Sequence, residues 1–171
     1  FSSVPLTEAL IRLNKHSNNL MTRNLFLTLG AERNGAPATL EKGAQAVRDA
    51  LARRGVSTHK LVLENGAGLS RIERTSADAL NQLLRAAYNS PLFAEFQSAL
   101  PIVALDGTLK RRFNGSALAG NAHLKTGSLR DVSALAGYVY TVNGQRVSFV
   151  MLVNHANARR SEAAQRALLE W

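Results

Sequence analysis

Two β-rich runs near the end of the chain are joined by a short turn, and this pair constrains the fold more than any other feature. Residues 133–141 and 145–153 are rich in β-branched and aromatic side chains, and Val142-Asn143-Gly144 separates them. Asn-Gly between two such runs is the strongest short-range hairpin signal, because both residues tolerate positive φ. The sequence therefore predicts an antiparallel hairpin, with a further strand entering at residues 123–126.

Most of the remaining sequence has helical periodicity. Apolar residues at helical spacing and flanking cap residues predict helices over residues 5–14, 19–29, 36–54, 76–88 and 158–171, with a short helix ending near residue 98. Gly30 is expected to end the second helix, and residues 61–63 are expected to form a short strand. The order predicts an α+β fold, an antiparallel sheet packed by helices. Three or four strands closed by one helix make an incomplete sheet, to be completed by strands from elsewhere.

Composition excludes several classes of function. The chain has no cysteine, which rules out disulfides and thiolate metal sites. The four histidines lie far apart without metal-ligand spacing, so no metal site is expected. The balance of 21 Lys+Arg against 12 Asp+Glu gives a net charge of +9, but the basic residues are scattered and not interleaved with aromatics. This pattern favours a solvated basic surface over nucleic-acid binding, and no apolar run is long enough to predict a membrane span.

Two short motifs carry groups suited to catalysis. Ser17-Asn18-Asn19 lies in a polar break between two predicted helices, where a hydroxyl and an amide can face one cleft. Lys125-Thr126-Gly127-Ser128 places a cation, two hydroxyls and an accessible backbone on one strand, which suits an anionic, extended ligand. Each motif alone is more often a helix cap or a surface strand end. Their conjunction, about 110 residues apart, is far more specific.

The conjunction resembles the second and third motifs of penicillin-recognising serine enzymes. Nearly the whole chain is similar to the low-molecular-mass D-Ala-D-Ala carboxypeptidase/endopeptidase class of penicillin-binding proteins, peptidase family S13. Four stretches carry this resemblance: His16 to Met21, Asn65 to Arg71, Asp106 to Leu109 and His123 to Leu129. In the second stretch, Asn65 and Ala67 stand where that class has Asp and Ser.

The first motif of the class, Ser-x-x-Lys, is expected upstream of the other two. The single literal match, Ser57-Thr58-His59-Lys60, follows the Ser-x-Asn motif and precedes a predicted strand, so it is interpreted as coincidence. The resemblance implies that residues 1–171 are the C-terminal portion of a penicillin-binding (transpeptidase-like) catalytic domain. The nucleophile and the missing strands would come from the N-terminal part of the same protein, and the chain alone would be inactive.

The resemblance also implies roles. Ser17, Asn19 and Lys125 would be catalytic, while Thr126, Gly127 and Ser128 would bind the substrate, and no metal or organic cofactor would be needed. The implied partners are peptidoglycan stem peptides ending in D-Ala-D-Ala and β-lactams, in the bacterial periplasm and with at most weak membrane association. Two alternatives stay open. The first is a non-catalytic module of the same fold that binds peptidoglycan or a protein, and the second is a basic nucleic-acid binder.

Overall fold

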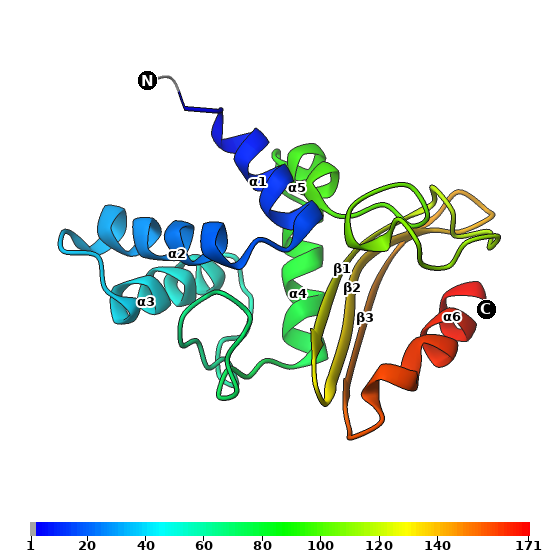
Figure 1. Ribbon diagram of the computed structural model, residues 1–171. Helices are drawn as coiled ribbons and strands as arrows, with labels where there is room; N and C mark the ends of the chain where they lie inside the picture. Colours follow the sequence, from blue (N-terminus) through cyan, green and yellow to red (C-terminus); the bar gives the residue numbers. More distant parts are fainter. Residues whose placement is uncertain (1–2) are drawn as a thin grey trace. The chain divides into compact units, whose positions relative to one another are not determined.

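The computed structural model describes residues 3–171, which divide into two compact units. One unit combines the N-terminal residues through Ser17 with Ala87–Trp171, and the other is Asn18–Ala86. The elements, labelled in Figure 1, are α1 (Leu6–His16), α2 (Asn19–Asn34), α3 (Leu40–Ala52), α4 (Ala77–Tyr88), α5 (Phe93–Ala99), η1 (Gly107–Leu109), β1 (Ala122–Leu129), β2 (Val132–Tyr140), β3 (Arg146–Asn154), η2 (Ala158–Ser161) and α6 (Glu162–Glu170). No helix among residues 3–171 combines the length and apolarity needed to cross a membrane.

The first unit is built on a three-stranded antiparallel sheet in the order β1-β2-β3. The predicted hairpin is confirmed: β2 and β3 are joined through Thr141 to Gln145, and Gly144 takes the positive φ of +74° that the turn requires. Lys125 on β1 pairs with Ala136 on β2. Within the described residues β1 is an edge strand of the sheet, and an isolated antiparallel bridge from Ile102 to His123 meets the start of its outer side.

The two faces of this sheet carry different side chains, because strand residues alternate. The hydrophobic core lies on one face of the sheet. Helix α6 covers this face (Figure 1), and Leu169 of that helix packs against the core. The buried core residues are Val103, Leu109, Phe113, Leu118, Ala122, Leu124, Leu135 and Val139. On the other face, Phe93 and Phe96 of α5 pack edge-on against Tyr138, with ring centroids 5.2 and 6.4 Å apart. This second face is also the one that presents Lys125.

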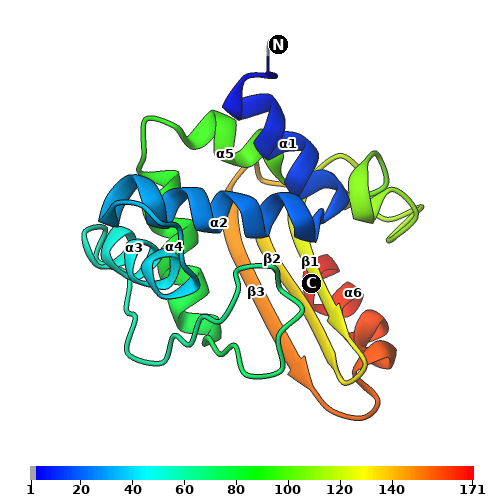
Figure 2. The same ribbon diagram turned by 60° about the vertical axis from the view of Figure 1, so that its left-hand side comes forward.

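The second unit is helical, with α2 and α3 side by side (Figure 2). The prediction that Gly30 ends α2 is wrong, since the helix continues to Asn34. Gly30 instead lies where α3 crosses: a Cβ at this position would lie 2.5 Å from the backbone nitrogen of Gly43. The glycine is required by the close approach of two helices, which a local sequence signal does not reveal.

Residues 61–63 do not form the expected strand. Val62 makes only an isolated antiparallel bridge with Arg74, and Asn65 to Gly68 form the loop between them. The backbone N–H groups of Glu64, Asn65 and Gly66 all point to the Glu73 carboxylate, each at 3.2 Å. Side-chain acceptors rather than a strand partner therefore satisfy this backbone.

Candidate active site

Ser17 lies at a sharp turn between two helices. It follows α1 with φ of +51°, a left-handed conformation that is uncommon for a residue other than glycine, and its N–H donates to the Asn14 carbonyl at 3.3 Å. The next residue, Asn18, caps α2 by accepting from the Met21 N–H at 2.9 Å. Strained backbone conformations of this kind persist where surrounding structure fixes them, and they cluster at functional sites.

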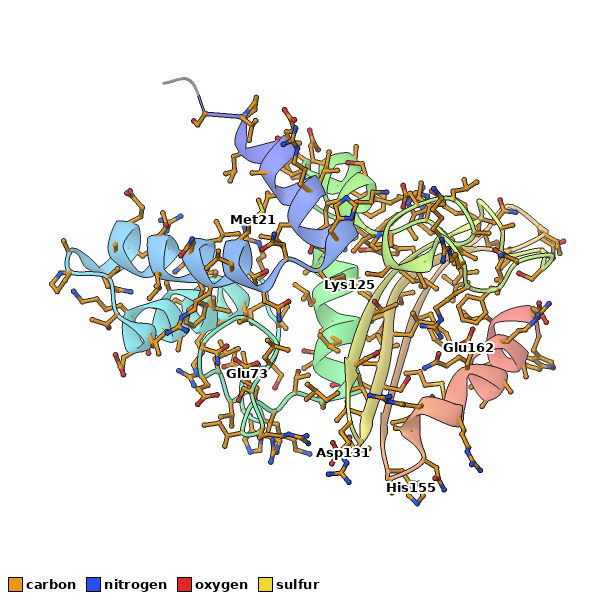
Figure 3. The ribbon with its side chains drawn as sticks, in the orientation of Figure 1. Met21, Glu73, Lys125, Asp131, His155 and Glu162 are labelled. Carbon is orange, nitrogen blue, oxygen red and sulfur yellow. The ribbon has the colours of Figure 1, made fainter. Side chains whose placement is uncertain are left out.

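Lys125 reaches Ser17 across 108 residues of sequence. Its Nζ donates to the Ser17 Oγ and, at 2.9 Å, to the backbone carbonyl of Thr126. Figure 3 shows Lys125 on β1 beside the end of α1. Burial lowers the pKa of the Lys125 ammonium below its ordinary value of 10.5. A lysine with a lowered pKa that contacts a hydroxyl can exchange a proton with it near neutral pH more readily than an exposed lysine can.

Thr126, Gly127 and Ser128 follow along the free edge of β1. The Thr126 hydroxyl is 2.9 Å from the Thr108 hydroxyl, and Ser128 is exposed. A Cβ at Gly127 would lie only 3.3 Å from the Cβ of Ala134, closer than an ordinary van der Waals contact, so a side chain at this position would crowd the strand. A ligand lying along this edge would meet side chains from both faces of the strand and could pair with its backbone.

The structure brings together five of the six predicted site residues, all in the first unit. Asn19 is the exception, because it is the first residue of α2 and belongs to the second unit. Its predicted role beside Ser17 and Lys125 stays a prediction, and so does the assignment of residues 1–171 to one portion of a catalytic domain.

Ser57 and Lys60 lie in a non-helical segment between α3 and the loop that contains Val62. The Ser57 N–H donates to the Gln82 side chain at 2.8 Å, and Ser57 lines an apolar cavity of about 360 Å³ that does not include Lys60. In a Ser-x-x-Lys motif, the serine and the lysine face the same cleft only if they lie one turn apart on a helix. Ser57 and Lys60 do not lie on a helix. This geometry supports the interpretation of the Ser57–Lys60 match as coincidence.

Sequence reasoning missed the residues that surround Ser17 and Lys125. Lys15 forms an ion pair with Asp106 at 2.6 Å, and Thr108 contacts Thr126. The stretch Asp106 to Leu109 is one of the four that carry the family resemblance. Its sequence does not indicate, however, that Asp106 contacts α1, which lies about 90 positions earlier in the chain.

His123 precedes Lys125 by two residues and lies on the same face of β1. It is half-buried, its Nδ1 is enclosed without a hydrogen-bond partner, and burial lowers its pKa. Among residues 3–171, no three His, Cys, Asp or Glu side chains gather as metal ligands.

Comparison with known proteins bears out the resemblance that the motifs indicate. The model of the D-Ala-D-Ala carboxypeptidase 3 (S13) family matches residues 1–171. A D-alanyl-D-alanine carboxypeptidase of Actinomadura sp. (strain R39) is 35% identical over 160 residues, which cover 91% of this chain and 30% of that protein. The chain thus spans about a third or less of the length of the curated relatives that it matches first.

Solved structures give the same result. Penicillin binding protein 4 (dacB) from Haemophilus influenzae superposes with a TM-score of 0.84 at 26% identity, covering 98% of this chain and 40% of that one. Its complex with a β-lactam superposes with a TM-score of 0.83 at 24% identity, covering 98% of this chain and 42% of that one. The predicted α+β, transpeptidase-like fold is confirmed. The chain belongs to the D-Ala-D-Ala carboxypeptidase 3 (S13) family.

Proposed function

We propose that this chain supplies the Ser-x-Asn and Lys-Thr-Gly parts of a serine-type D-Ala-D-Ala carboxypeptidase/endopeptidase active site. One observation carries the proposal: the Lys125 Nζ donates to the Ser17 Oγ, so the residues of two family motifs far apart in sequence meet at one point. The lowered pKa of Lys125 suits a proton-handling site better than a structural ion pair, which would raise it.

The nucleophile comes from outside these 171 residues. The only Ser-x-x-Lys of the chain, Ser57 to Lys60, is not on a helix, and the chain spans only 30% of the Actinomadura relative. We therefore assign the nucleophilic serine and its lysine to a longer polypeptide that contains this chain, hereafter the longer polypeptide. In this assignment the chain alone is inactive, since both reacting groups are missing.

The proposed reaction is acyl transfer. The external serine oxygen attacks the carbonyl of the penultimate D-Ala, and its proton passes through its lysine and the Ser17 hydroxyl to the nitrogen of the leaving D-alanine. Lys125 keeps a positive potential beside Ser17. The C–N bond breaks, free D-alanine departs, and water then hydrolyses the acyl-enzyme to release the shortened peptide.

Substrate recognition would use the edge of β1 together with Asn19, the role that the family resemblance implies for that residue. The hydroxyls of Thr126 and Ser128 bind the terminal carboxylate, and the Ser128 N–H is one of two donors to the developing oxyanion. Asn19 holds the penultimate amide. Gly127 lets the peptide approach the strand, because it has no side chain of its own to stand in the way.

The same external serine would be acylated by β-lactams, as the β-lactam complex of the H. influenzae protein suggests by analogy. The natural substrates are then peptidoglycan stem peptides ending in D-Ala-D-Ala, and the place of action is the bacterial periplasm. Both assignments rest on family membership together with the Ser17–Lys125 contact.

The test measures release of D-alanine from a D-Ala-D-Ala peptide by the longer polypeptide. Ser17→Ala should lower kcat by about 10²- to 10⁴-fold, the usual contribution of a positioned proton-transfer group. Ser98→Ala is the matched control, because Ser98 is an exposed serine of the same unit that bonds only to a nearby helix carbonyl. Wild-type kcat in Ser17→Ala would refute its role. No release and no penicillin adduct in the wild type would favour a non-catalytic binding module.

A further inference from the structure

Three consecutive residues, Asp106-Gly107-Thr108, contact the flanks of both Ser17 and Lys125. We propose that this turn, hereafter the Asp106–Thr108 turn, sets the distance between Ser17 and Lys125 and the orientation of the Thr126 hydroxyl. Asp106 and Thr108 are then positioning residues of the site, an inference that rests on the function proposed above.

Asp106 anchors the end of α1. Its Oδ2 pairs with the Lys15 Nζ at 2.6 Å, two residues before Ser17, and only 12% of the Lys15 side chain is exposed. Its Oδ1 accepts the Ile102 N–H at 2.8 Å. Ile102 in turn bridges His123 on β1. One carboxylate therefore ties the last turn of α1 to the strand that carries Lys125.

Gly107 allows the backbone of the turn to lie directly against α1. Its φ is +53°, and a Cβ at this position would lie 2.5 Å from the Lys15 carbonyl oxygen. Any side chain here would have to push away the backbone two residues before Ser17. The close approach brings the short Asp106 side chain within reach of the Lys15 ammonium.

Thr108 acts on the other half of the site. Its hydroxyl lies 2.9 Å from the Thr126 hydroxyl, next to Lys125 on β1. A hydroxyl has one proton to donate, so a Thr126 that donates to a substrate carboxylate can only accept in its bond with Thr108. Thr108 is placed to be that donor, and it would hold the Thr126 side chain in the carboxylate-binding orientation.

These contacts converge on the immediate sequence neighbours of Ser17 and Lys125. A shift of the Asp106–Thr108 turn would therefore move Ser17 relative to Lys125, and a misplacement of about 1 Å can cost about 10²-fold in rate. The pair between Arg112 and Glu162, in the same unit, joins at 3.4 Å and touches none of the site residues. It offers a matched ion pair whose loss should affect stability alone.

The experiment uses the longer polypeptide and a reporter penicillin. For wild type, Asp106→Asn and Glu162→Gln, the first-order acylation rate constant, the dissociation constant of the initial complex and the melting temperature are measured. Asp106→Asn keeps an acceptor for the Ile102 N–H but loses the charge opposite Lys15. We expect its acylation rate constant to fall about 10- to 100-fold, with a melting temperature close to that of Glu162→Gln.

A second pair of variants tests Thr108. Thr108→Val should raise the KM for a D-Ala-D-Ala peptide about tenfold, the loss of roughly one hydrogen bond to a charged group, and Thr108→Ser should restore it. The inference would be overturned if the acylation rate constant of Asp106→Asn, per folded molecule, matched that of Glu162→Gln. It would also be overturned if Thr108→Ser were as impaired as Thr108→Val. Either result would leave the proposed function standing. A wild type that no penicillin acylates would overturn both.

Discussion

The most sharply defined structural prediction concerns Gly137, which holds β1 against β2 beneath the candidate site. Gly137 pairs with Leu124 and has φ of +154°. A Cβ there would lie 2.1 Å from the His123 carbonyl oxygen, a backbone atom that cannot rotate away. Gly137→Ala must therefore separate the two strands just before Lys125.

The cost can be worked from these two features. Backbone strain at such a φ costs about 1–3 kcal/mol, and overpacking against a backbone atom adds about 1–3 kcal/mol. The short distance places the clash at the upper end, so we expect about 4–6 kcal/mol in all. For a chain of this size, 1 kcal/mol lowers the melting temperature by about 2–4 °C. Gly137→Ala should then melt more than about 8 °C below the wild type.

Gly144→Ala is the matched control, because Gly144 has a φ of +74° but no atom within 4 Å of the place where its methyl group would lie. Its cost should be strain alone, about 1–2 kcal/mol. Thermal unfolding followed by circular dichroism compares the two variants with the wild type. If Gly137→Ala melts within about 3 °C of Gly144→Ala, the close approach of β1 and β2 is wrong.

Three further predictions concern the candidate site of the first unit and the Asn65–Gly68 loop of the second. Lys125→Met should raise the melting temperature at pH 7, because burial lowers the Lys125 pKa and the charged ammonium disfavours the fold. In a pH series the gain should vanish as pH passes 10.5, where Lys125 is neutral in the unfolded chain as well. Gly127→Ala should cost about 1 kcal/mol, or about 2–4 °C in melting temperature, because its methyl would lie only 3.3 Å from the Ala134 Cβ. The same substitution should slow penicillin acylation of the longer polypeptide at least about tenfold by crowding the strand where the ligand lies; an unchanged rate would contradict ligand approach there. Asn65→Ala should lower the free energy of unfolding in urea by about 1 kcal/mol, because the Asn65 side chain accepts the Ala67 N–H at 2.8 Å, while Asn65→Asp, which keeps that acceptor, should not.

The features that sequence predicted well are those with local causes. The turn at Asn143-Gly144 needs positive φ and little else, so two residues suffice to indicate it. Thr39 caps α3 as its position suggests, accepting the Lys42 N–H at 3.3 Å. The resemblance to the family identified the pairing of Ser17 with Lys125, which composition and periodicity alone do not reveal.

The features that sequence missed depend on contacts between distant residues. Gly30 has the residue type of a helix end, but the approach of Gly43 from another helix decides its role. The apolar run around Val62 lacks a strand to pair with beyond one bridge, so β propensity there is overridden. Asp106 meets Lys15 only once the chain has folded, and no spacing rule connects positions 91 residues apart.

The central claim is that Ser17 and Lys125 form one half of a site whose nucleophile lies elsewhere on the same polypeptide. Labelling with a reporter penicillin, followed by intact-mass and peptide mapping, tests it most directly on both the 171-residue chain and the longer polypeptide. The account predicts a single adduct on the longer polypeptide, at a serine outside these residues, and none on the chain alone. An adduct on the 171-residue chain, at Ser57 or any other residue, would contradict it.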